Sequence, residues 1–231
     1  KVEEHHYQPP YFRLMERLNL EGANAAPRVM RPRLLGLEDL GESGADHLVD
    51  VREPLAYAAG HMQGAVCLPV GMIPAFAGWF ISEGDTIALI ASEEDELAQA
   101  MAHLVRIGLD NIVGGYVGVI PAAAQGKAMQ SIAMIDTEEV ARRLAEDSED
   151  WTLLDVRALD ERQQGSIDES EHVYVGELNT RWKELDRDRH YTLMCASGMR
   201  ASVAAGWLAS QGFKHLDVYL GSMGAWTNAQ G

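Results

Sequence analysis

Short apolar runs alternate with amphipathic segments along most of the chain. The apolar runs have the length of buried parallel strands and fall at residues 46–52, 86–90, 152–157 and 193–194. The segments that begin near Glu93 and Arg200 carry apolar residues on one helical face, and each meets a glycine where the pattern stops. Alternating strands and helices predict an α/β fold in which helices flank a central, mainly parallel sheet.

The pattern occurs twice, at an offset of about 105 residues. The run Leu48-Val49-Asp50-Val51-Arg52 has a counterpart in Leu153-Leu154-Asp155-Val156-Arg157. We therefore predict two tandem domains of the same fold, at residues 33–125 and 131–231, with the segment 121–127 as a linker.

An arm or linker, residues 1–32, precedes the first predicted domain. Pro9 and Pro10 favour a helix start directly after them, with Phe12, Met15 and Leu18 on one face. The chain begins with Lys1 rather than Met, so we expect it to be trimmed or to belong to a longer product.

The loop after the last apolar run carries the candidate chemistry. Cys195 lies between a predicted strand and the helix that opens at Arg200, where free backbone N–H groups and the helix dipole favour an anion. A thiol in this position, beside an arginine, is expected to hold more thiolate at neutral pH. Gly198 allows the loop to curl, so that its N–H groups can form an anion-binding nest. We predict Cys195 and Arg200 as catalytic and four loop residues as substrate-binding: Ala196, Ser197, Gly198 and Met199.

The first copy of the repeat lacks this chemistry. Superimposing the copies places Ala91 at the position of Cys195 and Glu96 at that of Arg200. Carboxylates at a helix start suit the helix dipole but repel a bound anion. We therefore expect the first domain to be catalytically inactive.

The charge of the chain narrows the choice of partners. The formal net charge of −16 argues against nucleic acid or an anionic membrane. No apolar run has the length of a transmembrane helix. Small molecules remain as partners, and the oligomeric state stays open.

Cysteine and histidine usage gives no sign of a disulfide framework or a metal. Cys67 and Cys195 fall in separate halves, which fits a reducing cytoplasm, and Cys67 is expected to be a packed core residue. His5 and His6 adjoin each other, but the chain has no His-x-His-x-Asp-His run. We predict no metal and no cofactor.

Three motifs together resemble a tandem rhodanese, a sulfurtransferase family, over about residues 33–231. They are Asp50-Val51-Arg52, the stretch 60–65 (Gly-His-Met-Gln-Gly-Ala) followed by Pro69, and the Cys-x-x-Gly-x-Arg loop at Cys195. The second copy departs at residues 165–170, where the family often has Gly-His-Ile-x-Gly-Ala. The Asp-Val-Arg residues read as a charged strand end tied to neighbouring loops.

The resemblance implies a function and a wider context. A sulfane sulfur would pass from thiosulfate or a low-molecular-weight persulfide to a thiol or cyanide through a persulfide on Cys195. The Pro-Pro-Tyr-Phe piece at residues 9–12 and the Met-Glu-x-x-Asn piece at 15–19 resemble the tail that joins a metallo-β-lactamase-fold domain to rhodanese domains in fused persulfide-oxidising proteins.

Three alternatives stay open. Cysteine-dependent phosphatases place five residues between Cys and Arg, whereas four separate Cys195 from Arg200, so a phosphatase or arsenate reductase is disfavoured. The chain could instead be a non-catalytic interaction module, or the sulfurtransferase part of a fused persulfide dioxygenase.

Overall fold

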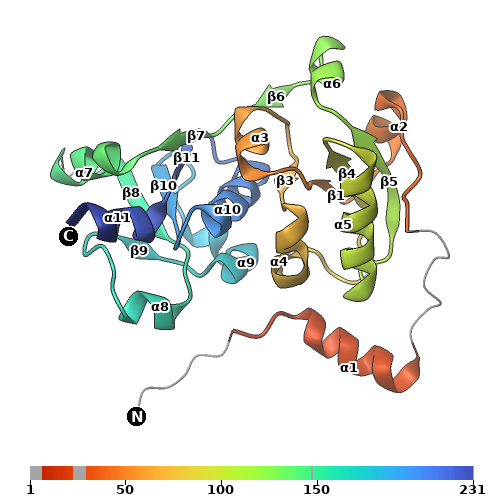
Figure 1. The fold of residues 1–231 in the computed structure, drawn as a ribbon, viewed down its shortest axis with the longest axis horizontal. Helices are drawn as coiled ribbons and strands as arrows, with labels where there is room; N and C mark the ends of the chain where they lie inside the picture. Colours follow the sequence, from red (N-terminus) through yellow and green to blue (C-terminus); the bar gives the residue numbers. More distant parts are fainter. Residues whose placement is uncertain (1–6, 23–29, 147, 231) are drawn as a thin grey trace. The chain divides into compact units, whose positions relative to one another are not determined.

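The computed structural model describes residues 7–22, 30–146 and 148–230 (Figure 1). Its contacts divide the chain into two compact units. The first unit is formed by residues 8–130, and the second by residues 131–231 together with Tyr7. Each unit is a parallel sheet with helices around it, so the predicted α/β class with two tandem domains is confirmed.

In the first unit, a four-stranded parallel sheet forms the centre. Its strand order is β3 (Val66–Cys67), β1 (His47–Asp50), β4 (Ile87–Ala91) and β5 (Ile112–Val117). The short strands β2 (His61–Met62) and β6 (Met129–Gln130) pair antiparallel. The helices are α1 (Tyr11–Glu21), α2 (Leu37–Glu42), α3 (Pro54–Ala59), η1 (Val70–Met72), α4 (Ile73–Phe80), α5 (Glu94–Arg106) and α6 (Ile120–Ala124). The segment predicted as a linker therefore begins as helix α6, because Pro121 is well placed in the first turn of a helix.

Helix α1 starts directly after Pro10, as predicted. Tyr11 lies against Gly78, and Leu14 lies against Gly108, at positions where a Cβ atom would collide with them. Of the predicted face, Met15 and Leu18 are half-buried, whereas Phe12 is 42% exposed, so the prediction is wrong at Phe12. The helix turns towards the two glycines because they leave room for large side chains.

The second unit contains a five-stranded sheet, in which every pair is parallel. Its strand order is β7 (Ala133–Ile135), β11 (Leu216–Tyr219), β10 (His190–Met194), β8 (Trp151–Asp155) and β9 (Glu171–His172). The helices are α7 (Thr137–Glu146), α8 (Leu159–Gln163), η2 (Val175–Glu177), α9 (Leu178–Arg181), η3 (Trp182–Glu184), α10 (Met199–Ser210) and α11 (Ser222–Gln230). None of the helices in the described part of the chain is long and apolar enough to cross a membrane.

The sheet register gives an exact correspondence between the two units. Asp50 of β1 pairs with Ile90 of β4, and Asp155 of β8 pairs with Met194 of β10. The next residues along the chain are Ala91 and Cys195, so the predicted superposition is confirmed.

Candidate active site at the carboxyl ends of the second sheet

Cys195 directly follows β10 and precedes the first turn of α10. Its side chain is almost completely covered, with 1% of the residue exposed. The backbone N–H of Gly198 donates a hydrogen bond to Sγ at 3.1 Å. Gly198 has φ +106°, a conformation that favours glycine and that turns the loop back onto the sulfur. The predicted curl of the loop is therefore present.

The start of α11 holds the loop from its other side. The Met223 N–H donates to the Cys195 carbonyl at 3.1 Å, and the Gly224 N–H donates to the Ala196 carbonyl at 3.0 Å. In a trans peptide the N–H points opposite to the carbonyl. The N–H groups of Ala196 and Ser197 therefore point away from α11, which leaves them available to an anion. Ala196 and Ser197 are exposed.

Ser222 joins the loop to the sheet, and it was not identified from the sequence. Its buried hydroxyl accepts a hydrogen bond from the Cys195 N–H at 3.1 Å and donates one to the Tyr219 carbonyl at 2.8 Å. Ser222 has φ +49°, an uncommon conformation for a residue with a side chain. The Cys195 backbone is thus held by a serine that follows the end of the neighbouring strand β11.

Arg200 makes a two-pronged ion pair with Glu161, a second residue that the sequence analysis missed. The two guanidinium nitrogens lie 2.5 and 2.6 Å from the carboxylate oxygens. Glu161 also accepts the Ala158 N–H at 3.2 Å, which ties it to the start of α8. The hydrogen bond from Arg200 holds the pKa of Glu161 below its usual value. The pKa of Arg200 is raised by Glu161 first and, to a smaller extent, by the nearby Cys195 sulfur.

Asp155 and Arg157 form a buried network at the end of β8, beside the loop. The Arg157 guanidinium donates to Asp155 at 2.7 Å and to the Gly165 carbonyl at 2.8 Å. In the first unit, Arg52 makes the same two contacts, with Asp50 and with the Gly60 carbonyl. The prediction that these residues tie a strand end to a neighbouring loop is confirmed.

The departure of the second copy at residues 165–170 leaves the local turn unchanged. The Ser170 N–H donates to the Ile167 carbonyl at 3.0 Å, as the Ala65 N–H does to the Met62 carbonyl in the first unit. What differs is the side chain that closes the turn.

In the first unit, the Tyr57 hydroxyl donates to the Ala65 carbonyl at 2.8 Å. In the second unit, Arg162 stands at the position of Tyr57 and donates to the Ser170 carbonyl at 2.6 Å. Arg162 also reaches Asp155 at 3.3 Å, so this carboxylate has two arginine partners. The turn therefore depends on a charged network here, where the first unit uses a tyrosine.

The corresponding loop of the first unit is filled by its own carboxylate. Glu96 bends back and accepts the Ser92 N–H at 2.7 Å. By the register of the two sheets, Ala56 stands where Glu161 does, and Val119 stands where Ser222 does. The first copy therefore lacks the four side chains that build the site of the second copy, which are Cys195, Arg200, Glu161 and Ser222.

Cys67 is completely buried in β3, as predicted, and burial raises the pKa of its thiol. His5 and His6 fall outside the residues that the structure describes.

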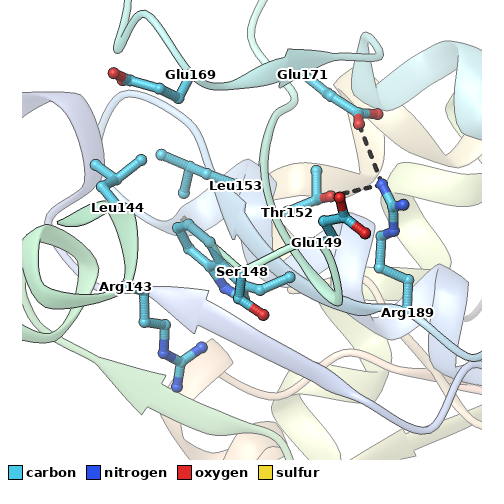
Figure 2. A pocket seen from close by; sticks show the side chains of 10 residues that line it. Arg143, Leu144, Ser148, Glu149, Thr152, Leu153, Glu169, Glu171 and Arg189 are labelled. Atoms are coloured by element: carbon cyan, nitrogen blue, oxygen red, sulfur yellow. Dashed lines mark hydrogen bonds and ion pairs between the residues drawn. The ribbon is translucent and has the colours of Figure 1, made fainter. Parts of the chain in front are cut away.

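A cavity of about 350 Å³ lies at the amino ends of the strands of the second sheet, opposite to the ends that carry Cys195. Trp151 and Thr152 line it from the start of β8, whereas Cys195 follows the end of the parallel strand β10. Figure 2 shows Arg189 directed at Glu171 and Thr152, at 3.6 and 3.3 Å. The cavity is therefore separate from the site around Cys195.

Comparison with known proteins gives one family. A model of the rhodanese-like domain matches residues 36–121 and 136–229. "Putative sulfurtransferase YtwF" of Bacillus subtilis is 35% identical over 95 residues, which are 41% of this chain and 90% of that protein. "Sulfurtransferase" of Allochromatium vinosum is 34% identical over 92 residues, 40% of this chain and 85% of that protein. A solved rhodanese-related protein from Thermoplasma volcanium is 29% identical, with a TM-score of 0.38, and covers 42% of this chain and 91% of its own.

Proposed function

This chain belongs to the rhodanese-like family, and from that premise we propose that its second unit transfers a sulfane sulfur through Cys195. The observation that carries the proposal is the cradle around the sulfur, in which the Gly198 N–H already donates to Sγ. The donor is thiosulfate or a low-molecular-weight persulfide, and the acceptor is a thiol or cyanide. We place the chemistry in residues 131–231, and the protein in the cytoplasm.

The first step forms a bond between Sγ of Cys195 and the outer sulfur of the donor. The bond between that sulfur and the rest of the donor breaks, and its electron pair leaves with sulfite or with a thiolate. In the second step, an acceptor thiolate attacks the outer sulfur, and the Cys195 thiolate leaves. Covalent transfer in two halves predicts ping-pong kinetics.

The loop stabilises the charge on the transferred sulfur. The N–H groups of Ala196, Ser197 and Gly198 form the anion nest, and the Arg200 guanidinium, paired with Glu161, lies near the Cys195 sulfur. With four residues between Cys195 and Arg200, the loop suits one sulfur atom better than a phosphate group. Turnover of an aryl phosphate would support the phosphatase alternative instead.

We propose that the first unit, residues 33–125 by sequence, is catalytically inactive. Ala91 has no nucleophile, and the Glu96 carboxylate fills the loop where an anion would bind.

Intact-mass spectrometry tests the proposal. The protein is exposed briefly to thiosulfate and, separately, to a low-molecular-weight persulfide, and then to cyanide. We expect a gain of one sulfur that cyanide removes, in the wild type and in the control Cys67→Ser. Loading of Cys195→Ser would overturn the assignment, and loading of no variant by either donor would favour the interaction-module alternative.

A further inference from the structure

Arg200 is the one cation that the loop from Cys195 to Arg200 carries, and Glu161 neutralises it. Both carboxylate oxygens are engaged, at 2.5 and 2.6 Å, and the carboxylate is fixed in turn by the Ala158 N–H. A guanidinium bound in this two-pronged way has its best donors occupied. The loop therefore offers backbone N–H groups to an anion, but little net positive charge.

The other arginines near the strand ends are also committed. Arg157 and Arg162 share the buried Asp155, and each donates to a backbone carbonyl as well. Asp155 offsets one of their two charges, and both guanidinium groups make their hydrogen bonds inside the second unit, so neither is free to bind a doubly charged donor at Cys195. The chain as a whole has a net charge of −16. The long-range field repels a dianion more strongly than it repels a singly charged or neutral molecule.

Large apolar side chains are exposed beside the loop. Met199 is 37% exposed and Leu220 is 49% exposed, and the Leu220 side chain lies beside Gly198. Tyr174 stacks on Tyr7 with ring centroids 3.9 Å apart, in the part of the second unit that also holds Arg200 and Glu161. These side chains suit the organic body of a persulfide.

The depth of the sulfur adds a steric argument. Because Cys195 is 1% exposed, only a slender group can reach Sγ. The inner sulfur of an organic persulfide carries one carbon substituent, whereas the inner sulfur of thiosulfate carries three charged oxygens.

We propose that Glu161 is a specificity-determining residue, which holds Arg200 in a neutral pair so that Cys195 accepts sulfur from organic persulfides of low charge in preference to thiosulfate. This inference rests on the proposed sulfur transfer at Cys195. The first unit offers an internal comparison, because Ala56 and Glu96 replace the two members of the pair together. If Glu161 only stabilised helix α8, its counterpart in the first unit could have stayed a glutamate when the arginine of the loop was replaced.

The test compares two donors, thiosulfate and the persulfide of 2-mercaptoethanol, by kcat/KM for sulfur loading of Cys195. In the wild type, the persulfide is the better donor. Glu161→Gln frees the guanidinium, and a charge-assisted hydrogen bond to a sulfonate is worth about 1.5–3 kcal/mol, so thiosulfate should gain about tenfold or more relative to the persulfide. Glu161→Gln combined with Arg200→Gln should lose that gain.

Asp160→Asn is the matched control, because Asp160 is exposed and its change alters the net charge equally. The ratio of the two donors should stay at the wild-type value in this variant. An equal shift in Asp160→Asn, or an unchanged ratio in Glu161→Gln, would overturn the role of Glu161 while sulfur transfer at Cys195 stands. Absence of loading from both donors in the wild type would instead overturn the transfer itself. If Glu161→Gln does not fold, Glu161→Asp keeps the charge but shortens the reach, and it should shift the ratio in the same direction.

Discussion

Replacement of Ser222 by alanine should loosen the backbone at Cys195 and leave the Cys195 side chain unchanged. The variant removes the acceptor of the Cys195 N–H and the donor to the Tyr219 carbonyl. A buried group left without its partner costs about 1–3 kcal/mol, and the second hydrogen bond contributes about 1 kcal/mol. The φ of +49° stays equally strained, because alanine keeps the Cβ atom. We therefore expect Ser222→Ala to lower the free energy of unfolding by about 3 kcal/mol.

Thermal unfolding and amide hydrogen exchange both measure this loss of stability. For a unit of this size, about 3 kcal/mol lowers Tm by roughly 10–20 °C. Amide exchange at Cys195, followed by NMR, should accelerate by up to roughly a hundredfold, since each 1.4 kcal/mol is a factor of about ten. Thr227→Ala is the control, because Thr227 lies on the same helix with an exposed hydroxyl bonded to the Met223 carbonyl at 2.9 Å, and it should change stability by less than about 0.5 kcal/mol. If Ser222→Ala exchanges at Cys195 like the control, the hydroxyl does not hold the loop and the reasoning fails.

Three further predictions concern other parts of the chain. Ala91→Cys, placed in a Cys195→Ser background, should gain no sulfur from either donor, because the Glu96 carboxylate fills that loop; loading seen by mass spectrometry would contradict this. Cys67 should resist iodoacetamide until the first unit unfolds, since burial raises its pKa, and rapid labelling of the native protein would show that β3 opens locally. Arg142 and Arg143 lower the pKa of Glu139 to about 2, so its stabilising effect is complete above the unfolded value of about 4.3 and is lost as the pH falls towards 2. Urea unfolding should therefore find Glu139→Gln destabilised at pH 6, with a difference from the wild type that shrinks steadily between pH 4 and pH 2.

The sequence was sufficient for the features that are local or repeated. Buried strands appear as apolar runs, and the start of α7 is held by a local contact, in which the Asp136 carboxylate accepts the Glu139 N–H at 3.0 Å. The glycine stops also follow from local backbone geometry: Gly108 and Gly212 have φ +80° and +92°. The Cys195 loop could be found because a strand, a turn and a helix start are adjacent in the chain.

Contacts between distant segments were beyond that reasoning. Glu161 meets Arg200 across 39 residues, and Ser222 meets Cys195 across 27. Nothing in the neighbouring residues marks either one, because an exposed-looking glutamate or a serine after a glycine is ordinary. A signal did exist in the comparison of the two copies, where alanine and valine stand in their places. A difference between repeats that share a framework points to the residues that the site, rather than the fold, requires.

The depth of the Cys195 sulfur has a consequence for regiochemistry. A persulfide offers two electrophilic sulfurs, and attack on the inner one would join the cysteine to the organic group as a mixed disulfide and release hydrogen sulfide. That sulfur carries a carbon substituent, which cannot descend beside a side chain that is 1% exposed and already in contact with the Gly198 N–H. The terminal sulfur has no such substituent and can enter. In the sulfur transfer that we propose, the covering of Cys195 would thus direct attack to the terminal sulfur and disfavour an unproductive mixed disulfide.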